Sequence, residues 1–209
     1  MHIKKAEYLI SSPSLENCPA PVKPEYAFIG RSNVGKSSLI NMLANNEKLA
    51  KTSNSPGKTS MINHFEIISA PKPGDTEESQ WYLVDLPGYG FAKTSQSTRR
   101  KWEQMIENYL RKRQNLVEVF VLIDARHSPQ KIDLEFIHKL GIWDVPFAIV
   151  FTKADKEKQR VVSKNVSDFL GKLRETWQFL PQHIVTSSIK RTGKEKILKL
   201  ISEKNDELK

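Results

Sequence analysis

The eight residues 30–37 read Gly-Arg-Ser-Asn-Val-Gly-Lys-Ser and match the phosphate-binding pattern G-x-x-x-x-G-K-[ST]. Glycines in such a loop let backbone N–H groups turn towards a phosphate, and the following helix adds the positive end of its dipole. Lys36 would reach the β- and γ-phosphates, and the Ser37 hydroxyl would bind Mg²⁺. The residues predicted to contact nucleotide here are Gly30, Arg31, Ser32, Asn33, Val34, Gly35, Lys36, Ser37 and Ser38.

The sequence on both sides of this loop supports the same interpretation. Apolar residues 26–29 predict a strand before it and residues 38–43 predict a helix after it, which is the context that the motif requires. A glycine turn beside an unrelated lysine is the alternative, and it leaves the flanking strand and helix unexplained. We therefore infer a nucleotide-binding protein.

A second motif, Asp85-Leu86-Pro87-Gly88, follows a predicted strand over residues 81–85. In this position Asp85 would lie near Mg²⁺ through a water molecule, and the Gly88 N–H would meet the γ-phosphate. The pattern D-x-x-G alone is often only a turn. Its place after two predicted strands favours the nucleotide-binding role.

Base recognition is predicted at Thr152-Lys153-Ala154-Asp155, which follows an apolar run over residues 145–151. The Asp155 carboxylate can accept hydrogen bonds from the N1–H and N2 amine of guanine, whereas adenine offers no matching donors. Lys153 would lie along the base and ribose, although a solvated Lys/Asp turn is the alternative. The residues expected to cap the base are Thr186, Ser187 and Ser188, with the Ser188 N–H directed at guanine O6.

Residues 55–60, Ser-Pro-Gly-Lys-Thr-Ser, lie where a switch segment would have to provide a threonine. Thr59 is the candidate second protein ligand to Mg²⁺, which prefers hard oxygen donors, while a plain Gly-Pro turn is the alternative. The predicted catalytic residues are Lys36, Thr59 and Gly88, and the predicted metal ligands are Ser37, Thr59 and Asp85. Further nucleotide contacts are expected from Gly57, Lys58, Ser60 and Met61.

The elements that must position these motifs alternate between strand and helix patterns. Residues 61–68, 81–85, 117–123, 145–151 and 183–186 predict strands, and residues 97–113, 131–141, 156–177 and 193–204 predict helices. This order predicts an α/β fold, a three-layer P-loop NTPase sandwich with a mostly parallel sheet and one antiparallel edge strand. Residues 1–24 hold four prolines and are expected to form an N-terminal arm, with a single G domain over residues 25–205.

Taken together, these motifs resemble the EngB (YihA/YsxC-type) ribosome-biogenesis GTPases of the TrmE–Era–EngA group. The resemblance covers residues 5–204 and rests on residues 30–38, 56–59, 85–93 and 152–155, the helix with Trp102 and Tyr109, and Asp124-Ala125-Arg126. Thr152 stands where Asn is more usual in GTPases, and threonine is usual in this family. The resemblance implies GTP binding, slow hydrolysis, assembly of the large ribosomal subunit, and an association with cell division and septation.

Hydrolysis is expected to be slow. Ras-type enzymes carry Gln directly after D-x-x-G, whereas this chain has Tyr89, whose phenol, if directed away from the phosphate, cannot orient water. Arg31 is interpreted as a surface contact rather than an arginine finger. Asn33 could help to hold K⁺, as an Asn does in some related GTPases, or could hydrogen-bond its own backbone; both alternatives stay open.

The overall charge points to a polyanionic partner. The 209 residues carry a net charge of +9 and an isoelectric point near 9.5, although a charge excess kept for solubility is the alternative. Cys18 is the only cysteine, so an intrachain disulfide is excluded. The longest apolar run, residues 145–151, is too short to span a bilayer. The basic clusters are Arg99-Arg100-Lys101, Arg111-Lys112-Arg113, and Lys190, Arg191, Lys194, Lys196 and Lys199.

We therefore expect a cytoplasmic monomer that binds GTP, GDP and Mg²⁺ and contacts the large ribosomal subunit and its rRNA, with neither DNA nor a membrane as partner. The alternative is a regulatory GTP switch that acts through protein effectors, with hydrolysis incidental. Ribosome co-sedimentation that is sensitive to salt would separate the two.

Overall fold

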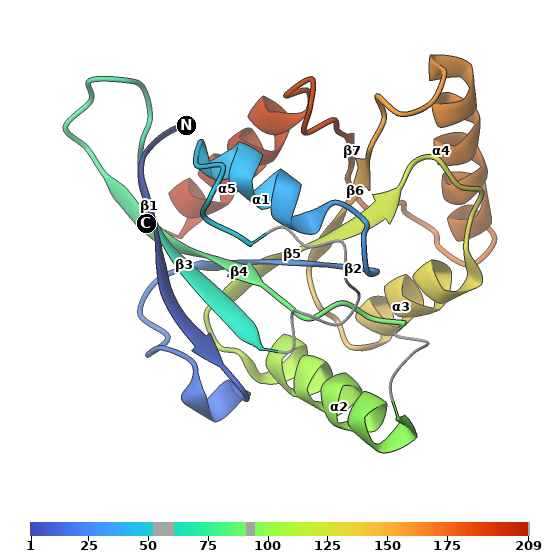
Figure 1. Ribbon diagram of the computed structural model, residues 1–209, viewed down its shortest axis with the longest axis horizontal. Coiled ribbons are helices and arrows are strands. Elements are labelled where there is room, and N and C mark those ends of the chain that lie inside the picture. The colour runs from blue at the N-terminus through green and yellow to red at the C-terminus, as the bar shows by residue number, and fades with distance from the viewer. Residues whose placement is uncertain (52–60, 91–94, 209) are drawn as a thin grey trace.

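The computed structural model describes residues 1–51, 61–90 and 95–208, and within them one sheet of seven strands lies between two layers of helices (Figure 1). The strands are β1 (His2–Ser12), β2 (Glu25–Gly30), β3 (Ile62–Ala70), β4 (Ser79–Asp85), β5 (Leu116–Asp124), β6 (Phe147–Thr152) and β7 (His183–Val185). The helices are α1 (Lys36–Ala44), α2 (Gln96–Lys112), α3 (Lys131–Ile142), α4 (Gln159–Arg174) and α5 (Lys194–Glu207), with a short 3₁₀ turn, η1 (Leu15–Asn17). None of the helices in these residues is long and apolar enough to cross a bilayer.

The sheet has the strand order β1-β3-β4-β2-β5-β6-β7. The five strands β4, β2, β5, β6 and β7 pair in parallel, and β3 pairs antiparallel with both β4 and β1. The predicted α/β fold with a mostly parallel sheet is therefore confirmed.

The antiparallel strand is not at the edge of the sheet, contrary to the prediction. Residues 2–12, expected to belong to an extended arm, form β1, which pairs outside β3 from His2↔Ala70 to Ser12↔Ile62. Register shifts between Ile3 and Lys5 and between Tyr8 and Ile10 interrupt the alternation by which a strand is recognised. The prolines of this segment all follow Ser12, so they leave the ladder intact.

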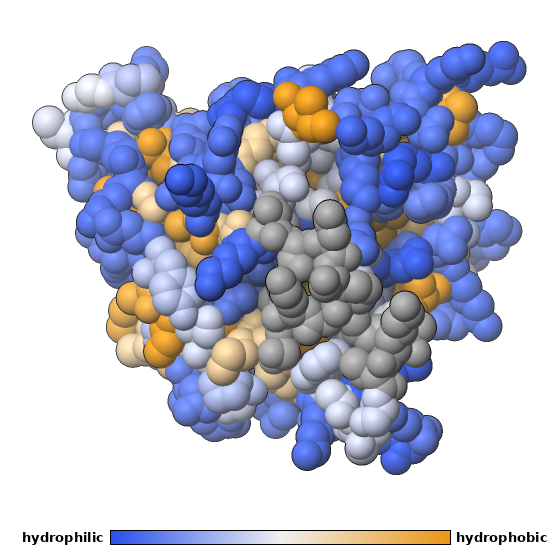
Figure 2. Space-filling view, viewed as in Figure 1, coloured by the Kyte–Doolittle hydropathy of each residue, from blue (hydrophilic) through white to orange (hydrophobic). Residues whose placement is uncertain are grey.

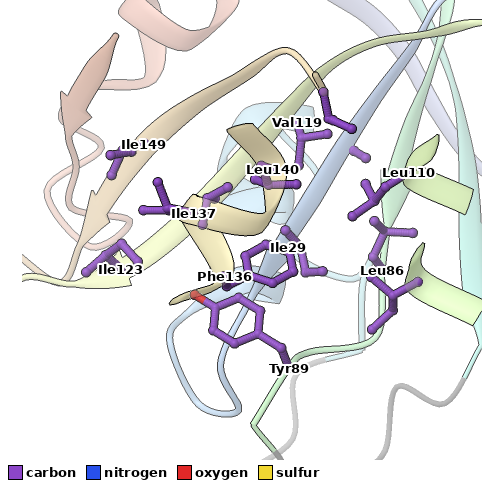
Figure 3. Packing of buried hydrophobic residues seen from close by; sticks show 14 of the residues in the cluster. Ile29, Leu86, Tyr89, Leu110, Val119, Ile123, Phe136, Ile137, Leu140 and Ile149 are labelled. Carbon is purple, nitrogen blue, oxygen red and sulfur yellow. The ribbon is translucent and has the colours of Figure 1, made fainter. Parts of the chain in front are cut away.

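Each face of the sheet is covered by its own helices. Apolar side chains of α1 and α5 pack on one face, and those of α2, α3 and α4 pack on the other. Figure 3 shows part of the second cluster, with Ile29 and Val119 of the sheet beside Ile137 and Leu140 of α3. Because both faces are covered, the central strands are apolar along nearly their whole length, which is typical of parallel sheets.

This packing places the carboxyl ends of β2, β4, β5, β6 and β7 at one edge of the molecule. Parallel α/β sheets bind their ligands at that edge, because the loops that follow the strands converge there. The phosphate-binding loop follows β2, and the predicted Asp85, Asp155 and Thr186–Ser188 groups follow β4, β6 and β7.

Candidate nucleotide-binding site

The phosphate-binding loop joins the buried strand β2 to α1 in a backbone conformation that its glycines permit. A Cβ on Gly30 would lie 2.8 Å from the carbonyl oxygen of Leu122 on β5, so this position admits only glycine without displacement of the backbone. Gly35 has a φ of +100° and Asn33 a φ of 62°, both in the left-handed region. Gly35 caps α1 without a side-chain hydrogen bond, which leaves the N–H groups of the first helical turn for a phosphate.

Lys36 and Asp85 lie side by side at the centre of the site. The Lys36 ammonium contacts Asp85 Oδ1, and both side chains are nearly buried. Burial lowers the pKa of Lys36, whereas the adjoining carboxylate favours the charged form. The structure therefore brings together the lysine predicted to contact phosphate and the carboxylate predicted to face the metal.

The donors predicted for Mg²⁺ fit that ion chemically as far as they are described. Ser37 lies in the first turn of α1 and Asp85 at the end of β4, and both offer hard oxygen atoms. Among the described residues no three His, Cys, Asp or Glu side chains gather into a cation site, so no all-protein cage competes with this arrangement there. Mg²⁺ is bound by few protein groups together with phosphates and water, which is the set that this site would provide.

Thr152, the last residue of β6, and Lys153 fasten the segment predicted to recognise the base to the phosphate-binding loop. The Thr152 hydroxyl donates to the carbonyl oxygen of Val34 at 2.6 Å, and the Lys153 ammonium contacts the carbonyl oxygen of Asn33. Lys153 also donates to Asp124 Oδ2 at 2.9 Å. The hydroxyl of Thr152, which replaces the usual Asn, thus makes a specific contact with the loop.

Asp124, at the end of β5, was not predicted as a site residue. Burial opposes its charge, but hydrogen bonds from Arg126 and Lys153 lower the pKa of Asp124 to about 2. The carboxylate thereby stays ionised and fixes the direction of Lys153. The signals in the sequence were its place at the end of a predicted strand and the Asp124-Ala125-Arg126 run that contributes to the family resemblance.

The groups predicted to read guanine lie together. The Ser187 hydroxyl donates to Asp155 Oδ1 at 2.6 Å, and the Ala154 N–H donates to the carbonyl oxygen of Thr186 at 3.1 Å. The Ser187 hydrogen bond lowers the pKa of Asp155, so this carboxylate is charged and oriented. Ser188 follows in the same loop and is partly exposed.

Tyr89 points into the core, as expected of a side chain that does not orient water. Its hydroxyl donates to Asp133 Oδ1 at 2.8 Å, and its ring stacks on Phe136 with centroids 4.2 Å apart (Figure 3). Arg31 of the phosphate-binding loop lies 3.6 Å from the other oxygen of Asp133. Asp133 therefore links the phosphate-binding loop, α3 and the segment after Gly88.

Sequence reasoning missed Asp133, although a signal existed. Asp133 shares one buried face of α3 with Phe136, Ile137 and Leu140, and an acid on an otherwise apolar helix face needs a partner. Burial raises the pKa of Asp133, against the hydrogen bond from Tyr89 and the charge of Arg31. The neighbouring Leu86, Pro87 and Gly88 are buried as well.

The switch predictions lie largely outside the described residues. Gly57, Lys58, Thr59 and Ser60 belong to residues 52–60, so their assignment to nucleotide and Mg²⁺ stays a prediction. Met61 is described and stands just before β3 with 36% of its surface exposed.

The basic clusters differ in how much of their charge faces outward. Arg113, predicted as part of an rRNA-contacting cluster, has a side chain only 6% exposed and donates to Glu25 at 2.5 and 3.0 Å. That prediction is wrong for Arg113, because its charge compensates a carboxylate inside the protein. His64 and Tyr109 also contact Glu25, and all three are fully buried.

Comparison with known proteins agrees with the order of the motifs. Residues 25–153 match a family model described as "50S ribosome-binding GTPase". The "Probable GTP-binding protein EngB" of Phocaeicola vulgatus is 52% identical over 209 residues, which cover both chains completely.

Solved structures share the fold. A crystal structure of a "probable GTP-binding protein engB" has a TM-score of 0.59 at 24% identity, over 88% of this chain and 99% of that one. Era in complex with MgGDPNP and nucleotides 1506–1542 of 16S ribosomal RNA has a TM-score of 0.67 at 23% identity, over 85% of this chain and 55% of that one. The family match and the full-length relative carry the assignment: the chain belongs to the EngB family of GTP-binding proteins, among the 50S ribosome-binding GTPases.

Proposed function

We propose that this protein binds GTP and GDP with Mg²⁺, hydrolyses GTP slowly to GDP and phosphate, and in its GTP form docks on the large ribosomal subunit during assembly. The observation that carries the nucleotide part is the charged Asp155, oriented by Ser187 at the same sheet edge as the phosphate-binding loop. A carboxylate held in this way selects guanine by pairing with its two donors.

The phosphates would be held by the N–H groups of the loop and of the first turn of α1, and by the Lys36 charge. Ser37, Asp85 and Thr59 would hold Mg²⁺, which neutralises charge on the β- and γ-phosphate oxygens when bound. Lys36 and the Gly88 N–H would stabilise the charge that develops on the γ-phosphate as water attacks in line.

Slow turnover follows from the segment after Gly88. Tyr89 is tied to Asp133 and stacked on Phe136, so no side chain in that position aligns the attacking water. Positioning the water is one of the two main contributions to phosphoryl transfer, the other being charge stabilisation. Faster hydrolysis then requires a group supplied by a complex, or K⁺ held near Asn33.

The family described as 50S ribosome-binding and the net charge of +9 support a role on the large subunit. We propose that the protein acts there as a cytoplasmic monomer through rRNA contacts, and that normal cell division and septation depend on it through ribosome assembly.

Equilibrium titration with labelled nucleotides tests the nucleotide part of this function. GTP and GDP should bind far more tightly than ATP, and Asp155→Asn should weaken GTP by about tenfold to a hundredfold, since hydrogen bonds to a charged group contribute about 1.5–3 kcal/mol. The same variant should gain affinity for xanthosine triphosphate, which presents a carbonyl in place of the amine.

Asp168→Asn is the matched control, because Asp168 lies partly exposed on α4 and pairs only with Lys164 among the described residues. It should bind GTP as the wild type does. Equal affinity for ATP and GTP, or an Asp155→Asn variant that keeps full GTP affinity, would contradict the proposed recognition of guanine.

A further inference from the structure

Two short segments that the structure describes completely, residues 45–51 after α1 and residues 188–199 at the start of α5, gather most of the excess charge. Together they hold seven Lys or Arg and two Glu, a net of five out of the nine positive charges of the chain. We refer to them as the α1–α5 surface. Asn45 joins the two segments, because its Oδ1 accepts hydrogen bonds from Arg191 at 2.6 Å and from the Lys194 ammonium.

Most cations of this surface form no ion pair with the described residues, although Lys199 pairs with Glu203. Within the described part of the chain, no carboxylate lies within ion-pair distance of the following side chains: Lys48, Lys51, Lys190, Arg191, Lys194 and Lys196. Helix α2 differs, because Arg99 pairs with Glu103 and Arg111 with Glu107, and Arg113, which directly follows the helix, pairs with Glu25. Among the residues that the structure describes, no carboxylate lies within ion-pair distance of Arg100, Lys101 or Lys112, which lie near opposite ends of α2.

Two of the cations on the α1–α5 surface are in an arrangement that favours an anion. Arg191 and Lys194 converge on one neutral oxygen, and Lys194 is only 8% exposed. Desolvation and the Arg191 charge lower the pKa of Lys194. A phosphate beside this pair would compensate both charges and supply charge-assisted hydrogen bonds.

The same loop is fastened to the guanine-reading residues. Ser187 pairs with Thr192 through two backbone hydrogen bonds, and its hydroxyl accepts from the Lys190 N–H at 3.0 Å while donating to Asp155. Lys190 and Arg191 thus lie in a loop that is hydrogen-bonded, through Ser187, to Asp155 of the candidate nucleotide site.

We propose that the α1–α5 surface is the docking site for the phosphate backbone of large-subunit rRNA; this rests on the proposed ribosomal function. The partner is inferred to be RNA because the surface offers cations without an apolar groove. Ile189 is its one exposed large apolar side chain, and hydrophilic side chains predominate over the start of α5 in Figure 2. Binding to an RNA phosphate backbone strengthens with the number of Lys and Arg side chains that contact phosphates, and it releases counterions from the RNA.

The test compares two variants that each lose three positive charges. One is Lys190→Gln/Arg191→Gln/Lys196→Gln on the α1–α5 surface, and the matched control is Arg100→Gln/Lys101→Gln/Lys112→Gln on α2. Binding to isolated large subunits is measured by co-sedimentation, with a non-hydrolysable GTP analogue, over a series of salt concentrations. Melting temperature and GTP affinity of each variant are measured first to establish that the fold and the nucleotide site are intact.

The α1–α5 variant should lose affinity by about tenfold or more, and its slope of log affinity against log salt should fall by about two units, as expected for three lost phosphate contacts. The α2 control should stay within about twofold of the wild type. The charge-conserving variant Lys190→Arg/Arg191→Lys/Lys196→Arg should bind like the wild type. Equal losses in both triple variants, or a loss confined to α2, would overturn the proposal.

Failure of this inference can be distinguished from failure of the proposed function. If the wild type does not sediment with large subunits, the ribosomal function is wrong. The same two variants are then compared for binding to protein-free large-subunit rRNA. There the α1–α5 variant alone should lose affinity. If the α1–α5 variant loses subunit binding but binds protein-free rRNA as the wild type does, the surface contacts a ribosomal protein and the RNA proposal is overturned.

Discussion

At the scale of single residues, the site depends on side chains that hold other side chains in place. Ser187 orients Asp155, Asp124 orients Lys153, and Asp133 holds Tyr89. Each of these partners would be costly to remove, because a buried or charged group would lose its compensating hydrogen bond. The nucleotide motifs were recognisable from sequence, whereas the roles of Asp124 and Asp133 as partners of Lys153 and Tyr89 required the structure.

Tyr89→Phe tests the link between the segment after Gly88 and α3. The change removes a hydrogen bond of 2.8 Å and leaves the Asp133 carboxylate buried with Arg31 at 3.6 Å. We expect the free energy of unfolding to fall by about 1–3 kcal/mol, the usual cost of an unpaired buried acceptor. Tyr8→Phe, whose exposed hydroxyl contacts only Ser11 among the described residues, is the control in urea unfolding. Equal losses of unfolding free energy in the two variants would show that the hydrogen bond from Tyr89 to Asp133 does not stabilise the fold.

Asn33→Ala tests whether the loop holds K⁺. If it does, wild-type hydrolysis should be faster in K⁺ than in Na⁺, because a fixed cation near the γ-phosphate stabilises the transition-state charge. The variant should hydrolyse GTP at one rate in both salts. A wild-type rate that is the same in K⁺ and Na⁺ at matched ionic strength would remove the potassium hypothesis and leave Asn33 as a loop residue with a φ of 62°.

At the scale of elements, Glu25 connects segments that are distant in the chain. It begins β2 and receives hydrogen bonds from His64 of β3, Tyr109 of α2 and Arg113 after α2. Burial acts to raise its pKa, but these hydrogen bonds outweigh burial and lower the pKa of Glu25 from 4.5 to about 2. A carboxylate whose pKa is lower in the folded state stabilises the fold above pH 4.5, and this contribution disappears as the pH falls towards 2.

Glu25→Gln should therefore change the pH dependence of stability. The shift from 4.5 to about 2 corresponds to about 3 kcal/mol, so the wild type should exceed the variant by up to that amount at pH 7. The difference, measured by urea unfolding, should shrink steadily between about pH 5 and pH 2. Glu7→Gln, at an exposed pair with Lys5, should show no such change. A difference that is constant with pH would contradict the role of the Glu25 charge.

The elements themselves were largely predictable because strand and helix periodicities alternate along the chain. The amphipathic helix predicted over residues 97–113 is confirmed as α2, in which Ile106, Tyr109 and Leu110 are buried. The strand β1 was not predictable, because its two register shifts destroy the alternation, and its pairing with β3 is settled only by tertiary contacts. Pairing of Arg113 with Glu25 was equally hidden, since 88 residues separate the two.

At the scale of the whole molecule, the proposed nucleotide site and the proposed RNA-binding surface adjoin each other. Thr152 and Lys153 are hydrogen-bonded to the phosphate-binding loop, and Ser187 joins Asp155 to Lys190 of the α1–α5 surface. A change in nucleotide can alter affinity for a partner only if the two nucleotide forms present different contacts. We predict from the sequence that residues 46–60 and 88–95 differ between the GTP and GDP forms. Residues 52–60 and 91–94 lie outside the described residues, and residues 46–51 belong to the α1–α5 surface.

If GTP controls docking on the large ribosomal subunit, the affinity of the full chain for separated large subunits should differ between the two nucleotide forms. Co-sedimentation should give an affinity about tenfold higher or more with a non-hydrolysable GTP analogue than with GDP, a coupling typical of two linked sites. Small subunits serve as the control and should bind weakly in both forms. Equal affinity for large subunits with the GTP analogue and with GDP would contradict the account.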